Sequence, residues 1–299
     1  MIAGRKQILG ERGFALLLLL PAFLILAGVI LVPLIDAVRM SFTITKLTSL
    51  HKHKYVGLRN YIKIFTDPTY WEVVTNTFRI VAISVGLSLL FGFVLALALN
   101  NIKRGRGALR ALYIIPWLVP GVVIGITWSW ILGTETGVVN YIFKSVGLIK
   151  ENLPWLADKT LSNIAVNMVF VWSSVPFIMV TLLGGLQAIP TDFLEAAIVD
   201  GSNFWQRLRF IILPLLMPII AIATILRVIY TMQNFVIIYM ITQGGPGYAT
   251  ETFALYVYET AFNSARLGRA SAIGTTWLFF LLIFVVLYLK LVVKEEKIY

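Results

Sequence analysis

Six long apolar segments determine what this chain can fold into. They cover residues 14–35, 76–99, 111–132, 161–183, 211–241 and 270–289. Four of them contain no charged residue, and the other two contain one each, Arg79 and Arg227. About 20 apolar residues suffice to cross a hydrocarbon core of about 30 Å, so each segment is long enough for one transmembrane helix. The sequence therefore predicts an all-α integral membrane protein with six transmembrane helices.

The composition agrees with a location in the lipid bilayer. The chain of 299 residues is 59% hydrophobic and only 13% charged, whereas soluble domains carry roughly 25% charged residues. A chain with so few charges cannot cover its exterior with polar groups, which excludes a soluble enzyme or a soluble nucleic-acid-binding domain. The net charge of +11 is assigned to basic residues that flank membrane segments and face lipid head groups. We expect a single membrane domain over residues 1–299 and no nucleic-acid partner.

Two of the apolar segments have unusual lengths. The first is too long for the apolar region of a signal peptide, so we expect it to be a retained helix. The fifth has 31 residues, about 46 Å of helix at 1.5 Å per residue. It must therefore tilt, break or lie partly outside the membrane, and Pro214 and Pro218 near its start offer a place for a break. Between the first two segments, a short surface helix is expected around Tyr55–Phe65.

The distribution of basic residues predicts the orientation in the membrane. An even number of spans places both termini on one side, and the total numbers of Lys and Arg on the two sides are nearly equal, twelve against eleven. Lys103, Arg104, Arg106 and Arg110, however, are concentrated in one short loop, and short loops carry the orientation signal. We therefore expect a multi-pass protein of the cell (inner or plasma) membrane with both termini in the cytoplasm.

A catalytic or metal centre is not expected. The six segments contain no carboxylate, and the chain has neither a GxxxxGK[ST] phosphate-binding loop nor an HExxH motif. His51 and His53 alternate with lysines that would repel a cation, which indicates a basic solvated loop. We predict no catalytic residue, no metal site and no cofactor bound by this chain.

One helical face in the fifth segment is polar. Arg227, Tyr230, Thr231 and Asn234 are spaced by three and four residues, which places them on the same side of a helix. Polar groups are costly in lipid, so this face must contact protein or a water-filled cavity. The alternatives are hydrogen bonding between helices and a polar substrate passage that also includes Gln233. Arg79 is expected to lie near a helix end and to extend toward the membrane surface.

The segment 184–210, between the fourth and fifth apolar segments, is more than a linker. Pro190 and the residues after it predict a helix start, with Glu195 three residues beyond Asp192 as in a capping box. Asp200-Gly201 is a turn signal, and a second helix is predicted over Asn203–Phe210. A helix, a sharp turn and a second helix are thus expected to project from the membrane.

These residues resemble a known family. Glu195-Ala196-Ala197, then Asp200-Gly201, then Leu213-Pro214 with Pro218, resembles the EAA loop of binding-protein-dependent ABC importer permeases. Residues 55–61 with Asp67-Pro68, and 242–246 with the residues that follow, resemble segments of the sugar-type permeases in this superfamily. The sequence departs from the pattern at Val236, where many members carry Asp.

The resemblance implies a type I importer permease that moves a sugar, with a di- or oligosaccharide favoured. It implies three partners: a second permease that completes a heterodimer, a cytoplasmic ATPase dimer that holds ATP and Mg, and an extracellular sugar-binding protein. The residues implied to couple the permease to the ATPase are Phe193, Leu194, Glu195, Ala196, Ala197, Asp200 and Gly201.

Other functions remain open at this stage. One is import of glycerol-3-phosphate or another sugar derivative, and another is a stand-alone channel or ion-coupled transporter. Ion coupling normally uses carboxylates within the membrane, and the six segments contain none. A membrane-embedded enzyme would need a catalytic constellation that the sequence does not offer.

Overall fold

The computed structural model describes residues 2–102 and 104–292. The described residues are mostly helical and group into two compact units, which we treat in turn. Five of their helices are long and apolar enough to cross a membrane, or six if one bent pair counts as a single span. A single domain over residues 1–299 stays a prediction.

The first unit comprises the chain up to Thr66 together with Val257–Thr276. It begins with an apolar rod that combines two helices and a π-helical turn, continues into a hairpin and a short helix, and ends with a second π-helical turn and the start of a long helix. These elements are α1 (Ile2–Leu26), η1 (Ala27–Leu31), α2 (Val32–Ser41), β1 (Thr43–Lys46), β2 (Ser49–Tyr55), α3 (Arg59–Phe65), η3 (Glu259–Asn263) and the first part of α14 (Leu267–Val292).

The hairpin of this unit was not expected from the sequence. β1 and β2 pair in antiparallel fashion with Thr43 opposite Tyr55, so the predicted surface helix begins only at Arg59. The β-branched residues of β1 favour a strand, but four residues are too few to give a clear alternating pattern. His53, predicted in a solvated loop, lies on β2 with Nδ1 2.9 Å from Oγ1 of Thr45 across the hairpin.

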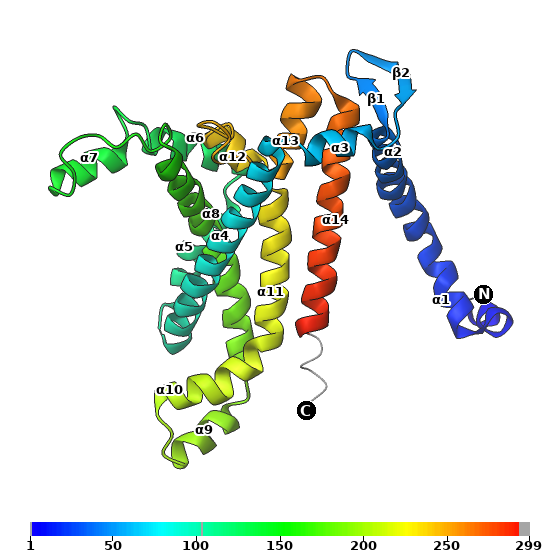
Figure 1. Ribbon diagram of the computed structural model, residues 1–299. Helices are drawn as coiled ribbons and strands as arrows, with labels where there is room; N and C mark the ends of the chain where they lie inside the picture. The colour runs from blue at the N-terminus through cyan, green and yellow to red at the C-terminus, as the bar shows by residue number, and fades with distance from the viewer. Residues whose placement is uncertain (1, 103, 293–299) are drawn as a thin grey trace. The chain divides into compact units, whose positions relative to one another are not determined.

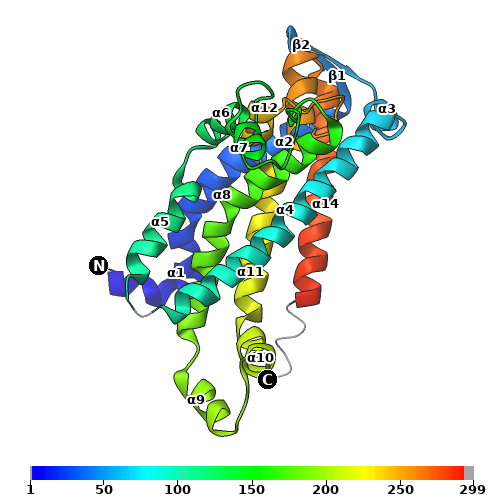
Figure 2. The ribbon, with the colours of Figure 1, turned by 90° about the vertical axis from the view of Figure 1, so that its left-hand side faces the viewer.

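The second unit contains the remaining helices. They are α4 (Pro68–Asn101), α5 (Arg106–Leu118), α6 (Gly121–Ile131), α7 (Val138–Ser145), α8 (Lys159–Ala188), α9 (Thr191–Val199), α10 (Phe204–Arg207), η2 (Leu208–Ile212), α11 (Leu213–Gln233), α12 (Val236–Ile241), most of α13 (Phe253–Tyr258) and the rest of α14. Figures 1 and 2 show α9 and α10 beyond one end of α8 and α11, with α6, α7 and α12 at the opposite end.

Helices α4, α8 and α11 pack around one apolar core. Its buried members include Ala96, Ile178, Leu182 and Leu216. Lipid tails are as apolar as leucine, so close packing rather than the hydrophobic effect holds such helices together, and small residues favour it. Gly92 of α4 is the clearest case, since a Cβ there would lie 2.6 Å from Cγ2 of Ile178 on α8.

The predicted span 111–132 is not one straight helix. α5 and α6 meet at an angle of 90°. Val119 and Pro120 are both extended between them, with ψ of 130° and 139°. Proline disfavours a helical conformation in the residue before it and cannot donate a backbone hydrogen bond. The Val119-Pro120 pair therefore accounts for the bend.

The long fifth segment breaks at its far end rather than at its prolines. α11 ends at Gln233, and Asn234 leaves the helical conformation with ψ of 107°. The Asn234 side chain then accepts a hydrogen bond of 3.1 Å from the backbone N–H of Ile237, near the start of α12. Pro214 follows the π-helical turn η2 within the continuous helix Phe204–Gln233, so the chain does not leave the helical conformation there.

Candidate functional site

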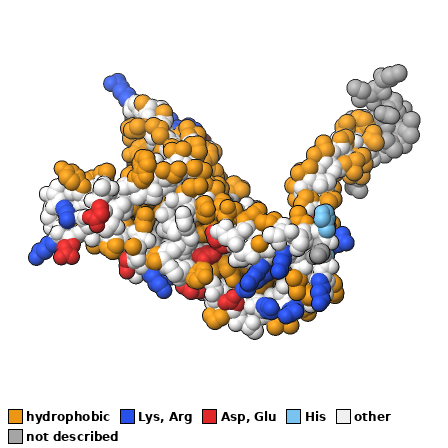
Figure 3. All heavy atoms as spheres, turned by 90° about the horizontal axis from the view of Figure 1, so that it is seen from above, with side chains coloured by type: hydrophobic (Ala, Val, Ile, Leu, Met, Phe, Trp, Pro, Cys, Tyr) orange, Lys and Arg blue, Asp and Glu red, His pale blue; other side chains and the backbone are white. Residues whose placement is uncertain are grey.

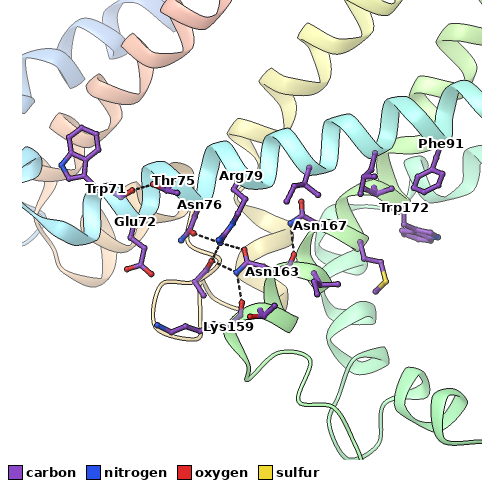
Figure 4. A pocket seen from close by; sticks show the side chains of 17 residues that line it. Trp71, Glu72, Thr75, Asn76, Arg79, Phe91, Lys159, Asn163, Asn167 and Trp172 are labelled. Carbon is purple, nitrogen blue, oxygen red and sulfur yellow. Dashed lines mark hydrogen bonds between the residues drawn. The ribbon is translucent and has the colours of Figure 1, made fainter. Parts of the chain in front are cut away.

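A cavity of about 1070 Å³ opens between α4 and α8. Its lining comes from the first 24 residues of α4 and the first 14 of α8, together with Ala249. Figure 4 shows polar side chains gathered around Arg79 and, farther along the same two helices, the rings of Phe91 and Trp172. The cavity thus has a polar end and an apolar, aromatic end.

Both helices begin with the same kind of cap. Asp67 precedes α4 and accepts a hydrogen bond of 3.0 Å from the Thr69 N–H. Asp158 precedes α8 and accepts bonds of 2.9 Å from the N–H groups of Thr160 and Leu161. An acidic N-cap satisfies backbone donors that have no partner within the helix. These caps fix where each helix begins and hence which of its turns face the cavity.

Arg79 organises the polar end. Its guanidinium donates to Oδ1 of Asn76 at 2.7 Å, to Oδ1 of Asn163 at 2.8 Å and to the Ala249 carbonyl at 3.3 Å. Asn163 in turn donates to the carbonyls of Lys159 at 2.8 Å and Ala249 at 3.0 Å. The two asparagines and the carbonyl hold Arg79 against the cavity wall, toward the starts of α4 and α8; that Arg79 extends toward the membrane surface stays a prediction.

The loop after α12 brings the Ala249 carbonyl to this network. Thr250 donates to the Gly245 carbonyl at 2.9 Å, and its Oγ1 is 2.7 Å from Oγ1 of Thr242. Asn76 donates to the Tyr248 carbonyl at 2.7 Å, which ties the loop to α4. The segment after residue 242, one of the two that resemble the sugar-type permeases, thus contributes Ala249 to the wall of the polar end.

Asn167 carries an acceptor that the protein itself does not use. Its side chain is 6% exposed, and its Nδ2 donates to the Asn163 carbonyl at 2.8 Å. Its Oδ1 is buried and has no hydrogen-bond partner among the described residues. Oγ1 of Thr231 and Nε of Arg227 on α11 are in the same condition among the described residues, so this feature does not by itself mark a binding point.

The aromatic end provides flat apolar surfaces. Phe91 is 48% and Trp172 is 39% exposed. Trp128 contacts Trp172 edge to face, with ring centroids 5.5 Å apart, and so orients the indole. Small-molecule sites typically combine such apolar surfaces with a few placed polar groups.

The predicted passage residues on α11 lie elsewhere. Among the lining residues of this cavity we find none of Arg227, Tyr230, Thr231, Gln233 and Asn234. Arg227 and Thr231 are buried, and Arg227 donates to Oγ of Ser174 on α8 and lies 4.6 Å from the Tyr230 ring centroid. Gln233 is exposed on a different face of the helix. The contact with Ser174 agrees with the alternative of hydrogen bonding between helices.

The spacing of the polar cavity residues in the sequence already indicated that they share helical faces, and our sequence analysis did not use it. Asn76 and Arg79 are three residues apart, and Asn163 and Asn167 are four apart, so each pair lies on one helical face. Both pairs occur within apolar segments, where polar side chains need a partner or a cavity.

The segment 184–210 forms the predicted helix, turn and second helix. Gly201 adopts a left-handed conformation with φ of +76°. The Gly201 N–H donates to the Ile198 carbonyl at 3.0 Å and the Ser202 N–H to the Ala197 carbonyl at 2.9 Å, which is a Schellman motif. Glu195 is exposed. The large apolar side chains that α9 and α10 expose are Phe193, Ile198, Val199, Phe204 and Trp205.

The predicted capping box is at a different place. α9 begins at Thr191 with Pro190 as its N-cap, and no side chain caps it. The capping box instead joins Asn203 and Gln206 at the start of α10, through reciprocal bonds of 2.9 and 2.8 Å. Pro190 has extended geometry before the helix, with ψ of 133°, and this places Asp192 inside the first turn rather than at the cap.

The helical fold, the glycine turn of the projecting segment and the open polar cavity define a membrane permease. Residues 88–294 match the family described as the inner membrane component of binding-protein-dependent transport systems. The chain belongs to this family, as the resemblance predicted. It is the permease component of an ABC transporter, a multi-pass protein of the inner membrane, and is not itself catalytic.

Individual relatives and one solved structure agree with this family assignment. The chain is 35% identical to the trehalose/maltose transport system permease protein MalF of Thermococcus litoralis over 280 residues, 94% of each chain. It is also 35% identical to the sulfoquinovosyl glycerol transport system permease protein SmoG of Agrobacterium fabrum, covering 96% of this chain and 93% of the relative. A bacterial ABC transporter that imports the acidic polysaccharide alginate has the same fold, with a TM-score of 0.82 at 21% identity over 97% of this chain and 96% of the other.

Proposed function

We propose that this permease imports a sugar, with a di- or oligosaccharide favoured, through the cavity between α4 and α8. The observation that carries the proposal is the lining of this cavity, which combines the polar network around Arg79 with the exposed rings of Phe91 and Trp172. A sugar hydroxyl both donates and accepts, so it can share in the network around Arg79. The apolar face of a sugar ring can pack on the exposed aromatic rings. The two relatives at 35% identity, named for trehalose/maltose and sulfoquinovosyl glycerol transport, support this substrate class.

A sugar derivative with a negative charge is the second candidate. The polar end of the cavity contains Arg79, Lys159 and Glu72, which together give one net positive charge. Arg79 is already engaged by two neutral amides rather than by a carboxylate, so its charge is not neutralised by these partners. A sulfonate or phosphate on the sugar would be attracted to this end.

A second permease subunit would close the cavity. Ile83, Leu87 and Phe91 line the cavity and are exposed, on the same helix as Arg79. Lipid cannot cover the Arg79 network without a large cost, because the hydrocarbon offers no hydrogen bonds. A partner permease that contributes the opposite wall would shield the network and leave a passage between the two chains.

The segment from α9 to α10 would couple this passage to ATP hydrolysis. The exposed side chains of Phe193 and Ile198 would enter a groove on a cytoplasmic ATPase, where burial contributes about 1.5–3 kcal/mol each. Leu194, Ala196 and Ala197 would shape the packed face of α9, Glu195 would pair with a basic group, and Asp200 with Gly201 would set the turn. ATP and Mg would be held by that ATPase dimer.

The test is ATP-driven uptake of labelled maltose and trehalose by the whole transporter in proteoliposomes. We expect Asn163→Leu to lower uptake about two- to tenfold, since a lost hydrogen bond is worth about 0.5–1.5 kcal/mol. Trp172→Ala should also lower uptake, because it removes an aromatic surface of the cavity. Trp130→Ala is the matched control, because Trp130 is 76% exposed on α6 and is not among the cavity lining. Unchanged uptake and selectivity in both cavity variants would contradict the assignment. Stronger competition by sulfoquinovosyl glycerol or glycerol-3-phosphate than by unlabelled maltose would favour the charged substrate.

A further inference from the structure

The first unit carries cationic side chains that the transport cavity does not explain. Residues 42–66 contain five Lys or Arg residues and no Asp or Glu. Two more arginines, Arg266 and Arg269, lie at the start of α14. Figure 3 shows blue Lys and Arg side chains beside a pale blue histidine side chain, and both histidines of the chain lie in β2.

Five of these seven cations surround one cavity of about 260 Å³. The cavity is lined by β1, α3 and the start of α14, and its described lining contains no acidic side chain. Like charges gathered around one small volume repel one another, so an anion bound among them would be stabilised. The cationic members, which we call the cation ring, are Lys46, Arg59, Lys63, Arg266 and Arg269.

The frame of this cavity is closely packed. Asn60 is buried and donates to the carbonyls of Ser41 at 2.8 Å and Thr43 at 2.9 Å, which joins α3 to the start of the hairpin. Gly268 of α14 approaches so closely that a Cβ there would lie 2.0 Å from the Thr43 carbonyl oxygen. The backbone that carries the cation ring is therefore held on a fixed scaffold.

The helices of this unit place the cation ring at the level of the lipid head groups. The spanning helix Gly13–Ser41 has 29 residues and ends directly before the hairpin. Its length is about 43 Å at 1.5 Å per residue, and a bilayer with its head groups is about 40–45 Å thick. A second spanning helix, α14, begins at Leu267, beside Arg266. Residues where spanning helices begin or end lie where the lipid phosphates are.

The short helix α3 has an apolar face next to its cations. Leu58, Ile62 and Phe65 are spaced by four and three residues, which places them on one side of the helix, and they are 61%, 62% and 45% exposed. Arg59 and Lys63 each follow one of these apolar residues and line the cavity. A helix with an apolar face and a basic face is typical of a position in the plane of the membrane interface.

We propose that the cation ring binds the phosphate group of an anionic lipid, whose acyl chains lie along the apolar face of α3. Arginine suits this role, because its planar guanidinium donates two parallel hydrogen bonds to one phosphate. Phosphatidylcholine offers the same phosphate, but the cation ring would repel its choline group. Phosphatidylglycerol has no such group and keeps its negative charge.

The experiment measures lipid binding to the whole transporter in nanodiscs. The chain has no cysteine, so Leu58→Cys gives this permease a single site for a bimane label, next to Arg59. Its fluorescence is followed as brominated phosphatidylglycerol or brominated phosphatidylcholine, each a quencher, replaces the unlabelled phosphatidylcholine. We expect wild type to prefer phosphatidylglycerol by about tenfold or more, since each cation near a lipid phosphate contributes a preference of about fivefold.

The variants test whether the cation ring causes this preference. Arg59→Gln/Lys63→Gln, at exposed positions of the ring, should lose most of it. The matched control Lys144→Gln/Lys150→Gln removes two exposed cations elsewhere on the chain and should keep the preference. Arg59→Lys/Lys63→Arg should also keep it, because the charge is unchanged.

Two results would overturn this lipid site. Equal quenching of wild type by the two brominated lipids would do so without any variant. If inorganic phosphate then raised the thermal stability of wild type but not of Arg59→Gln/Lys63→Gln, the cavity would be a site for a free anion instead. Equal loss of the preference in both Gln pairs would show a general attraction to the membrane rather than a site. The readout is lipid binding alone, so these outcomes do not depend on the import of a sugar.

Discussion

Gly201 offers a quantitative test of the proposed docking of α9 and α10 on the ATPase. It occupies the C′ position after α9 with φ of +76°. No atom lies within 4 Å of a Cβ built at this position. Substitutions of Gly201 therefore cause no clash, and their effect comes from the left-handed backbone alone.

The magnitude follows from the cost of that conformation. A left-handed conformation costs an L-residue about 1–2 kcal/mol, whereas Asn adopts it more readily. At 1.4 kcal/mol per factor of ten, Gly201→Ala should weaken association with the ATPase about fivefold. Gly201→Val should weaken it about 30-fold or more, since a β-branched residue is least tolerant of positive φ. Gly201→Asn should lie close to wild type.

Gly147 provides an internal control with the same geometry. It has φ of +75°, no atom within 4 Å of a built Cβ, and the same pair of backbone hydrogen bonds after α7, from the N–H groups of Gly147 and Leu148. Gly147→Val should therefore carry the same local strain at the end of the second unit opposite α9.

The assay is recovery of the ATPase with the tagged permease from mild detergent, together with ATP-driven uptake in proteoliposomes. The expected order for Gly201 is wild type, Asn, Ala and Val, with Gly147→Val like wild type in ATPase recovery. Equal recovery across the Gly201 series would refute the role of this turn in docking. Equal losses for Gly201→Val and Gly147→Val would show that general destabilisation, and not docking, explains the effect.

Three further predictions concern packing and caps. Gly92→Val should lower the thermal stability of the detergent-solubilised protein, because the valine side chain would overlap Ile178. Ile178→Ala in the same protein should partly restore that stability. A Gly92→Val protein as stable as wild type would contradict the packing. Arg227→Met and Ser174→Ala should change stability in a non-additive way without changing the preference between maltose and trehalose, and altered sugar preference would return Arg227 to the passage. Asn203→Ala should cost about 1 kcal/mol of local helix stability, seen as faster hydrogen exchange in α10, and unchanged exchange would argue against the cap.

The features that depend on composition along the chain could be predicted from the sequence. Long apolar runs and their flanking charges identify spanning helices because the bilayer imposes length and apolarity on each one separately. The turn at Gly201 was equally accessible, since the Asp200-Gly201 pair is a local signal and its conformation needs no distant partner. The bend at Pro120 was also local, but an apolar run on both sides of it concealed the break.

The site could not be predicted because two arginines look alike in the sequence. Arg79 and Arg227 are each the single charge of an apolar segment, and periodicity places both on a polar face. Their difference lies in what packs against them. Ser174 of α8 covers Arg227 within the protein, whereas Arg79 meets Asn163 and the Ala249 carbonyl at the wall of an open cavity.

The partners of Arg79 come from positions 84 and 170 residues away, so no local pattern reports them. The relevant signal was paired polarity on two separate segments, Asn76 with Arg79 and Asn163 with Asn167. When two apolar helices each carry a polar pair, they are most stable with the pairs facing one another, because each pair then supplies hydrogen-bond partners to the other. What distinguishes the two polar faces is the open cavity, since Arg79, Asn163 and Asn167 line it whereas Arg227 and Thr231 do not.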